Sequence, residues 1–356
     1  MATDRNKLNV RRPAVAGTFY PGDSGELKKM ADGFLDAADC KGSDDIRAII
    51  VPHAGYVFSG STAARAVAQI APGTVYDRIF LLGPSHCTAF DGASADSTAD
   101  CYATPLGNVT VDRDTARHLI DADTVFTDYQ AAHRDEHCLE VQLPLLQRRL
   151  LNMPPIVPIV IGTQDGRKLR RMAAALKPYF NRHNLFVISS DFSHYPTYDD
   201  ALKADSLTGK AIEQDSLAAF VDALEANDDA HYPQLCTSAC GQCAIAVLLM
   251  LTGGRADLSI RHLAYCNSGD SPYGGKDRVV GYHAFAVTGQ KNAQRSEKPF
   301  VLTDDEKQTL LKIARRSIEN ALTHDDRPLC DESEITPTLN AKCGAFVTLN
   351  EDGWLR

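Results

Sequence analysis

Four short apolar runs stand out along the chain, and a polar segment follows each of them. They are residues 46–51, 78–82, 156–161 and 185–189. Their hydrophobic residues are continuous rather than alternating, which is typical of strands buried on both faces of a parallel sheet. The pattern therefore predicts an α/β fold in which these four runs form the central strands.

Segments with helical patterns lie between and after these runs. They cover residues 61–70, 167–179, 201–224 and 244–251, and the third of them reads as one or two helices. Because strands and helices alternate, we expect a predominantly parallel sheet flanked by helices. In such folds the loops after the strands form the ligand crevice, so the polar segments are the first place to look for chemistry.

The composition changes after Gln290, where the chain becomes polar. We predict one domain over residues 1–290, a linker over 291–298 and a partial α+β extension over 299–356. The extension is too short for a robust core of its own. Within it, Thr303 and Glu306 form a capping-box pattern that predicts a helix.

Two further expectations concern the same extension. The helix that begins after the capping box runs to about Leu322. Residues 343–349 look like the beginning of a strand, and the chain ends soon afterwards at Arg356.

The overall composition excludes several classes of protein. Hydrophobic residues make up 44% of the chain and charged residues 23%, as in ordinary globular proteins. The net charge is −9, and a mildly acidic chain without a basic tract is a poor candidate for binding nucleic acid or anionic membranes. The longest strongly apolar run, Cys243–Leu251, is too short for a membrane span.

The expected cellular compartment follows from the N-terminal segment and the cysteines. Residues 1–10 lack the apolar region of a secretory signal. Without such a signal, the ten cysteines are expected to be free thiols, metal ligands or core residues rather than a disulfide framework. We therefore predict a reducing, cytoplasmic environment.

Two histidines, His53 and His86, come just after successive predicted strands. Neighbouring strands lie about 4.8 Å apart, so side chains at two such ends can converge on one ion. Neutral imidazole is the commonest nitrogen ligand of transition metals. The alternative is that each histidine only bonds its own loop.

A third strand end carries Asp191 and His194. The carboxylate could orient the imidazole or share a proton with it, which makes His194 a candidate general acid or base. The alternative is that Asp191 caps the next helix and His194 is simply exposed.

A further segment holds His133, His137 and Glu140, spaced so that neighbouring pairs could share a helix face. The spacing differs from that of the zincin motif, and a solvated helix start is the alternative. We favour His137 over His133 because apolar residues follow it, which indicates an approach to the interior.

The pair Cys240 and Cys243 precedes the apolar helix, where a thiolate would be stabilised by free backbone N–H groups. A redox dithiol would need a thioredoxin-like context, which is absent, and a structural zinc site would normally need a second pair. Two interpretations remain open. Cys240 could add a single thiolate to the two strand-end histidines, or both cysteines could be buried and act as small hydrophobic residues.

Several common motifs are missing from the sequence. It has no phosphate-binding P-loop, no G-x-G-x-x-G and no G-x-S-x-G, which disfavours P-loop NTPases, Rossmann dehydrogenases and α/β-hydrolases. The Gly-rich loop Asn267–Gly275 could close over a crevice or could simply be a turn.

Taken in order over residues 11–288, a set of short motifs resembles the Memo family. They are Arg12–Pro21, Val51–Tyr56 with Ser59 and Gly60, Leu82–His86, Thr104–Gly107, Glu136–Pro144, Ser189–His194, Cys240 and Gly241, Tyr265 with Ser268 and Asp270, and Val280–Tyr282. The family fold is similar to that of LigB-like extradiol dioxygenases, which use non-haem iron.

This resemblance implies roles for individual residues. His53 and His86 match the two metal-ligand histidines, and Cys240 matches the family cysteine that replaces a glutamate of the dioxygenases. His137 and His194 match histidines that lie beside the metal and handle protons. Asp191 matches a residue that lines the same pocket. A thiolate ligand favours softer ions, so we expect Fe(II) or copper, with zinc as a further candidate.

Two classes of function follow from the resemblance. One is a mononuclear-metal redox enzyme acting on an unidentified small molecule. The other is a non-catalytic module for metal handling or for binding phosphopeptides or proteins. The end of the chain, Gly344–Leu349 and Gly353–Arg356, resembles the start of an AMMECR-type domain, and both families are associated with a radical-SAM partner.

Overall fold

The computed structural model describes residues 8–289, 302–323, 335–336, 339, 350–351 and 354–355. The chain divides into two compact units, residues 1–291 and 292–356. All of the predicted site residues belong to the first unit. The linker predicted over residues 291–298 lies outside the described residues.

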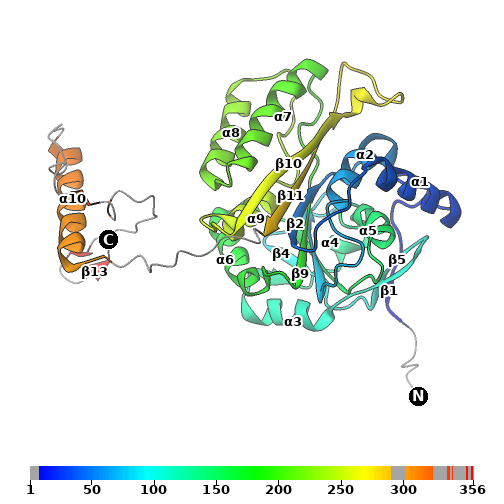
Figure 1. Cartoon of the computed structure of the whole chain (residues 1–356), viewed down its shortest axis with the longest axis horizontal. Helices are drawn as coiled ribbons and strands as arrows, with labels where there is room; N and C mark the ends of the chain where they lie inside the picture. The colour runs from blue at the N-terminus through cyan, green and yellow to red at the C-terminus, as the bar shows by residue number, and fades with distance from the viewer. Residues whose placement is uncertain are drawn as a thin grey trace. The chain divides into compact units, whose positions relative to one another are not determined.

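Eight strands of the first unit form one sheet, in the order β10–β11–β2–β9–β3–β8–β4–β7 (Figure 1). Their bounds are β2 (Ile46–Val51), β3 (Arg78–Pro84), β4 (Ala93–Ala95), β7 (Phe126–Thr127), β8 (Ile156–Ile161), β9 (Asn184–Ser189), β10 (Leu258–Asn267) and β11 (Gly281–Gly289). The four strands predicted from the apolar runs are confirmed as β2, β3, β8 and β9. They lie side by side and are parallel.

The sheet as a whole is mixed. Strand β11 pairs with β2 in the antiparallel direction, and β4 pairs with β8 in the same way. The predicted parallel arrangement thus describes the centre of the sheet only. The sequence pattern does not predict β10, because polar side chains such as Arg261 and His262 interrupt its apolar positions.

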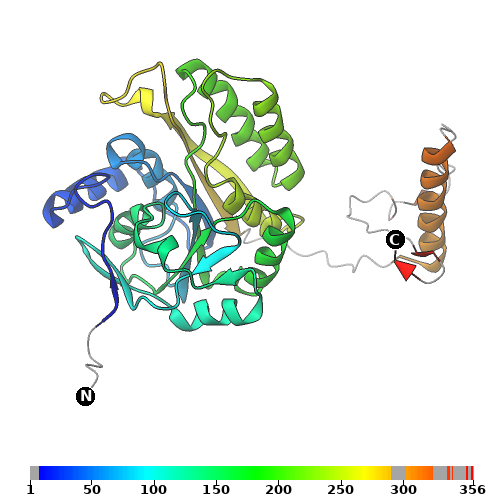
Figure 2. The same ribbon diagram turned by 180° about the vertical axis from the view of Figure 1, so that it is seen from behind.

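Helices cover both faces of the sheet (Figures 1 and 2). The helices are α1 (Ser24–Ala37), α2 (Tyr56–Val67), α3 (Arg113–Ala122), α4 (Ala131–Arg134), α5 (Leu143–Arg149), α6 (Gly166–Leu176), α7 (Tyr198–Glu213), α8 (Leu217–Asp229) and α9 (Gln242–Thr252). Three short 3-10 turns are η1 (Glu140–Gln142), η2 (Lys177–Tyr179) and η3 (Ser268–Asp270). The predicted helical segment 201–224 is two helices, α7 and α8, which pack against each other.

Alternate residues of each central strand face two separate cores. Ile50 and Leu82 are buried in one core, against α3, α6, α8 and α9. Ile49 and Leu81 are buried in the other, against α1, α2 and α5. Because both faces are filled, the central strands are held rigidly, and so are the loops that leave their ends.

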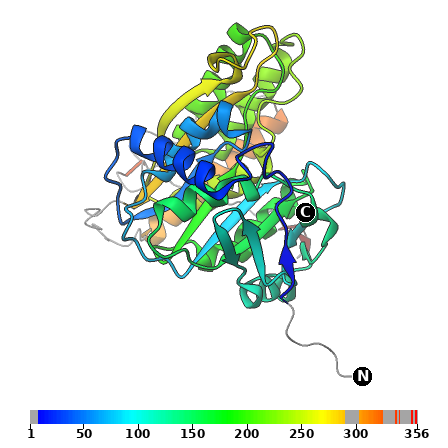
Figure 3. The same ribbon diagram turned by 90° about the vertical axis from the view of Figure 1, so that its right-hand side faces the viewer.

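A second, smaller sheet joins β1 (Val10–Arg11), β5 (Cys101–Thr104) and β6 (Gly107–Thr110). Figure 3 shows β1, in blue, which is an outer strand of this sheet. The segment that follows β1 is held by Glu140, which is fully buried and accepts hydrogen bonds from the backbone of Ala14 and Val15, from Tyr20 and from Arg11. The buried carboxylate thereby fixes the path of residues 11–20.

The second unit contains α10 (Asp304–Thr323), β12 (Asn350–Glu351) and β13 (Trp354–Leu355). The predicted capping box is confirmed: the Glu306 N–H donates to Thr303 Oγ1 at 3.2 Å, and the Thr303 N–H donates to Glu306 Oε2 at 2.8 Å. The strand predicted over residues 343–349 lies outside the described residues.

Among the residues that the structure describes, none of the helices combines the length and the apolar character of a bilayer span. The eight cysteines of the described part are free thiols.

Candidate metal centre

The carboxyl ends of three neighbouring parallel strands bring the predicted site residues together. His53 follows β2, His86 follows β3, and Asp191 and His194 follow β9, the strand between them. Cys240 reaches the same place from the N-terminal end of α9. The ring centroids of His53 and His86 are 5.1 Å apart.

The protonation state of His53 is set by its neighbours. Its imidazole is buried, and Nδ1 lies 2.8 Å from Ser189 Oγ. The single hydroxyl proton of Ser189 is donated to the Cys138 carbonyl at 2.7 Å, so Nδ1 must carry the proton of the imidazole. The lone pair of Nε2 therefore faces Cys240, whose Sγ is 3.3 Å away.

Burial and the nearby imidazoles hold the pKa of His53 well below its usual value. The ring is therefore neutral, as a metal ligand must be.

His86 is oriented by a different residue, Glu136. Its Nδ1 donates to Glu136 Oε1 at 2.9 Å, and its backbone N–H donates to Oε2 at 2.6 Å. Burial opposes ionisation of Glu136, but the hydrogen bonds that it accepts from His86 and Cys138 outweigh burial and bring the pKa of Glu136 to about 2. Because this carboxylate accepts from Nδ1, Nε2 is the nitrogen that can offer its lone pair to a metal ion, an arrangement found repeatedly behind metal-bound histidines.

The third member of the group is Cys240. Its backbone N–H donates to the Asp191 carbonyl at 3.2 Å, and the N–H of Gly241 donates to Ser190 Oγ at 2.9 Å. Burial and the nearby carboxylate raise the pKa of the Cys240 thiol above its usual range. A thiolate at this position therefore needs a cation beside it, since a bound metal ion deprotonates a coordinating thiol.

These three side chains fit a single metal ion. One ligand atom from each of His53, His86 and Cys240 lies within 4.8 Å of the others. Metal–nitrogen and metal–sulfur bonds are about 2.1 and 2.3 Å long, so ligand atoms of one ion lie about 3–4 Å apart. The 3.3 Å between His53 Nε2 and Cys240 Sγ already meets this requirement. The donor set of two neutral imidazoles and a thiol suits transition metals.

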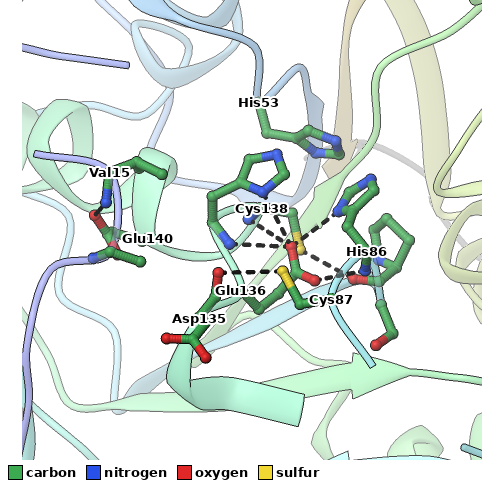
Figure 4. A network of polar contacts seen from close by, with 12 residues as sticks. Val15, His53, His86, Cys87, Asp135, Glu136, Cys138 and Glu140 are labelled. Carbon is green, nitrogen blue, oxygen red and sulfur yellow. Dashed lines mark hydrogen bonds and ion pairs between the residues drawn. The ribbon is translucent and has the colours of Figure 1, made fainter. Parts of the chain in front are cut away.

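A second set of potential ligands shares one histidine with the first. Figure 4 shows Glu136 in the middle of a polar network, next to Cys138 and His86, and these three also place ligand atoms within 4.8 Å of one another. The Cys138 thiol is buried and donates to the Pro84 carbonyl at 3.2 Å. Sequence reasoning missed both Glu136 and Cys138. Their positions on either side of His137 were the available signal.

The structure separates the three residues of the segment 133–140. His137 joins the cluster, with its ring centroid 4.7 Å from that of His86 and 4.9 Å from that of Phe19. His133 is buried elsewhere and contacts Tyr102, while Glu140 holds the segment after β1. Burial lowers the pKa of His137, so this ring too is neutral. Ser189, which sets the tautomer of His53, also escaped the sequence analysis.

Asp191 and His194 do not form the carboxylate–imidazole pair that their spacing allowed. Asp191 Oδ1 accepts the backbone N–H of His53 at 2.7 Å and that of Ala54 at 3.3 Å. The carboxylate thus holds the loop that carries the first histidine. His194 Nδ1 donates to the Phe192 carbonyl at 2.8 Å, so Nε2 is the nitrogen that can exchange a proton with a bound molecule.

The C-x-x-C pair is also divided. Cys240 lies at the site, while Cys243 lies within α9 and packs against the core, where burial raises its pKa to about 11. This arrangement matches the single-ligand reading of the motif rather than a dithiol.

Comparisons with known proteins agree on the family. The profile described as "Memo-like protein" matches residues 11–286. A MEMO1 family protein of Aeropyrum pernix is 35% identical over 292 residues, covering 79% of this chain and all of the relative. One from Methanopyrus kandleri is 32% identical over 285 residues, covering 77% of this chain and 97% of the relative.

Among solved structures, an uncharacterized protein from Escherichia coli K12 aligns with a TM-score of 0.42 and 12% identity, over 66% of this chain and 98% of that one. The sequence matches cover the segments that carry His53, His86 and Cys240, and they establish that this chain belongs to the Memo-like protein family.

Proposed function

We propose that this chain binds one transition-metal ion through His53, His86 and Cys240 and uses it in redox chemistry on a small organic molecule. The observation that carries the proposal is the direction of the two imidazoles. Each has its Nδ1 proton held by an acceptor, Ser189 in one case and Glu136 in the other, so that both Nε2 atoms remain free as ligands.

Three protein ligands leave further coordination positions for water or substrate. Bound iron or copper would supply Lewis acidity and one-electron chemistry toward oxygen, and zinc would supply Lewis acidity alone. A cysteine in place of a carboxylate favours copper relative to the usual facial triad of two histidines and one carboxylate, although iron fits the same geometry. The two histidines shared with the facial triad are the basis for the proposed relationship to extradiol-type dioxygenases.

The other residues of the site have separate tasks in this proposal. His194 takes a proton at Nε2, since its Nδ1 proton is already held by the Phe192 carbonyl. His137 and Phe19 form a wall of the site through their ring contact at 4.9 Å. Asp191 keeps the His53 loop in place through two backbone hydrogen bonds.

A second candidate function is metal handling without turnover. It is favoured by the second ligand set, in which Cys138 adds a thiol close to His86 and Glu136. A thiol suits a soft ion such as Cu(I), and a second ligand set is not needed for a single catalytic ion. In that case His194 would have no task, and its loss would have no functional consequence.

The direct test is elemental analysis of anaerobically purified protein, reported as metal per chain. We expect close to one iron or copper ion per chain in the wild type and almost none in His53→Ala or Cys240→Ala. Cys243→Ala is the matched control, because it removes a thiol three residues away that lies outside the site, and it should keep its metal.

The variant His194→Ala then separates the two functions. It should keep the metal but lose oxygen consumption with aromatic substrates if the site is catalytic. Full metal content in both His53→Ala and Cys240→Ala would refute the proposed site. Circular dichroism of each variant shows whether a loss of metal reflects a loss of fold.

A further inference from the structure

The residue after His194 has an unusual backbone conformation. Tyr195 has a φ of 75°, in the left-handed region that glycine favours and that a bulky side chain rarely adopts. Its backbone N–H donates to the Val279 carbonyl at 2.6 Å, which fixes this conformation. Backbone strain of this kind is commonly kept at functional sites.

The conformation determines where the Tyr195 ring lies. In an extended segment, successive side chains point to opposite sides. The left-handed residue breaks this alternation and brings the Tyr195 ring beside His194, with ring centroids 5.6 Å apart in an edge-to-face arrangement. The ring is 37% exposed, so one of its surfaces faces solvent next to the candidate proton-handling residue.

The guanidinium group of Arg278 lies over the Tyr195 ring. The guanidinium carbon of Arg278 is 4.0 Å from the Tyr195 ring centroid, close enough for a cation–π contact. Arg278 is exposed, and within the described ranges no carboxylate pairs with it. By contrast, buried Arg11 and half-buried Arg255 each have a carboxylate partner.

The segment that carries Arg278 is anchored at several points. Tyr198 donates through its hydroxyl to Asp270 at 2.6 Å, Ser271 Oγ donates to the Val57 carbonyl at 3.0 Å, and the Val279 N–H donates to the Pro196 carbonyl at 2.9 Å. The stack of guanidinium on ring is therefore a fixed part of the rim beside His194.

We propose that Arg278, held over Tyr195, binds a carboxylate group of the molecule on which the metal site acts. This inference rests on the proposed function and names the substrate class: a small carboxylic acid. A stacked guanidinium keeps its N–H groups free at its edge, where they match the two oxygens of a carboxylate. Tyr195 acts as a positioning residue, since it orients the guanidinium rather than binding the substrate.

The test uses probes that anchor on the metal and differ only in charge. Benzohydroxamate coordinates a metal ion through two oxygens, and its 3-carboxy and 4-carboxy derivatives add the anionic group at two positions. Their dissociation constants are measured on the full chain loaded with Co(II), from the change in the visible spectrum of the ion. The spectrum also reports whether the ion is bound before any probe is added.

In the wild type we expect at least one carboxylated probe to bind roughly tenfold more tightly than the neutral one. Arg278→Gln should abolish this advantage and leave the affinity for the neutral probe unchanged. Tyr195→Gly, which removes the ring and relieves the backbone, should reduce the advantage without loss of metal. Lys276→Gln is the matched control, because it removes a charge two residues away and should keep the advantage.

Two results would overturn the inference while the proposed function stands: Co(II) binds but no carboxylated probe is favoured, or the advantage persists in Arg278→Gln. If the wild-type chain binds no metal at all, the proposed function fails and the inference fails with it. The spectrum before probe addition distinguishes these cases.

Discussion

Two histidine clusters lie at different places on the same sheet, and they differ in what their nitrogens do. In the candidate metal centre, His53 and His86 each have Nδ1 held by an acceptor, and the Nε2 of His53 faces a second potential ligand, the Cys240 thiol, at 3.3 Å. In the second cluster, on β10 and β11, His283 Nε2 donates to the Asp205 carbonyl at 2.9 Å, and its Nδ1 lies 2.9 Å from His262 Nε2.

Both nitrogens of His283 are therefore occupied. The Asp205 carbonyl can only accept, so His283 Nε2 carries the proton and Nδ1 accepts one from His262. Burial lowers the pKa of His283 to about 3, so the ring is neutral in both its contacts. A histidine therefore becomes a candidate ligand through the neighbours that fix its tautomer, and not through burial or proximity to other histidines.

The strongest test of this contrast concerns Asp205, which lies in the second cluster. Its carboxylate is fully buried and accepts hydrogen bonds from Ser193 and from Tyr265. Burial nevertheless raises its pKa from 3.8 to about 7. The folded state therefore holds the proton more tightly than the unfolded state, so this contribution to stability is complete below about pH 4 and is lost as the pH rises through 7.

We predict that the free energy of unfolding of the wild type, relative to Asp205→Asn, falls by up to about 4 kcal/mol between pH 4 and pH 8. The difference between the two proteins is the proper quantity, because buried histidines such as His283 have lowered pKa values and give the opposite slope. Urea unfolding followed by circular dichroism measures it. As a control, Asp222→Asn changes an exposed position on α8, and its free energy of unfolding should depend on pH as that of the wild type does. If Asp205→Asn also showed the pH dependence of the wild type, the prediction would be contradicted.

The next effect concerns the carboxylates behind the histidines. Glu136→Gln keeps the size of the side chain but replaces one of two accepting oxygens with a donor, which faces the N–H groups of His86. Loss of such a support typically weakens metal binding about 10–100-fold. The measurement is competition for Zn(II) with a chromophoric chelator.

Glu213→Gln is the control from the second cluster, where Glu213 accepts the backbone N–H of His262 at 2.9 Å. It should leave the affinity for Zn(II) unchanged. Equal losses in the two variants would mean that the clusters are not functionally distinct. A thermal melt of each protein separates weaker binding from partial unfolding.

Much of the fold could be predicted because it depends on local patterns. The continuous apolar runs identify β2, β3, β8 and β9, since strands buried on both faces need apolar residues at every position. His53 and His86 follow two of these strands, and this was enough to place both at the carboxyl ends of the central strands. Cys240 could be added only as one of several interpretations of its motif.

The supporting residues could not be predicted, for a physical reason. Glu136 bonds His86 across 50 positions of the chain, and Ser189 bonds His53 across 136. Neither contact leaves a periodic or spacing signal, because each depends on how distant loops meet above the sheet. The same holds for Asp191, whose nearness to His194 in sequence indicated a pair, whereas its carboxylate contacts the His53 loop.

A substitution of His262, with a weaker effect, tests whether the second cluster is purely structural. His262→Phe keeps an aromatic ring at an exposed position but removes the donor to His283 Nδ1, so a buried acceptor loses its partner. Because solvent can partly replace the lost donor, we expect a loss of about 1 kcal/mol in the free energy of unfolding and an unchanged metal content. Urea unfolding and elemental analysis of the same preparation measure both quantities. A drop in bound metal would mean that the two clusters are coupled, and the contrast between their hydrogen-bond partners would no longer explain which histidines bind the ion.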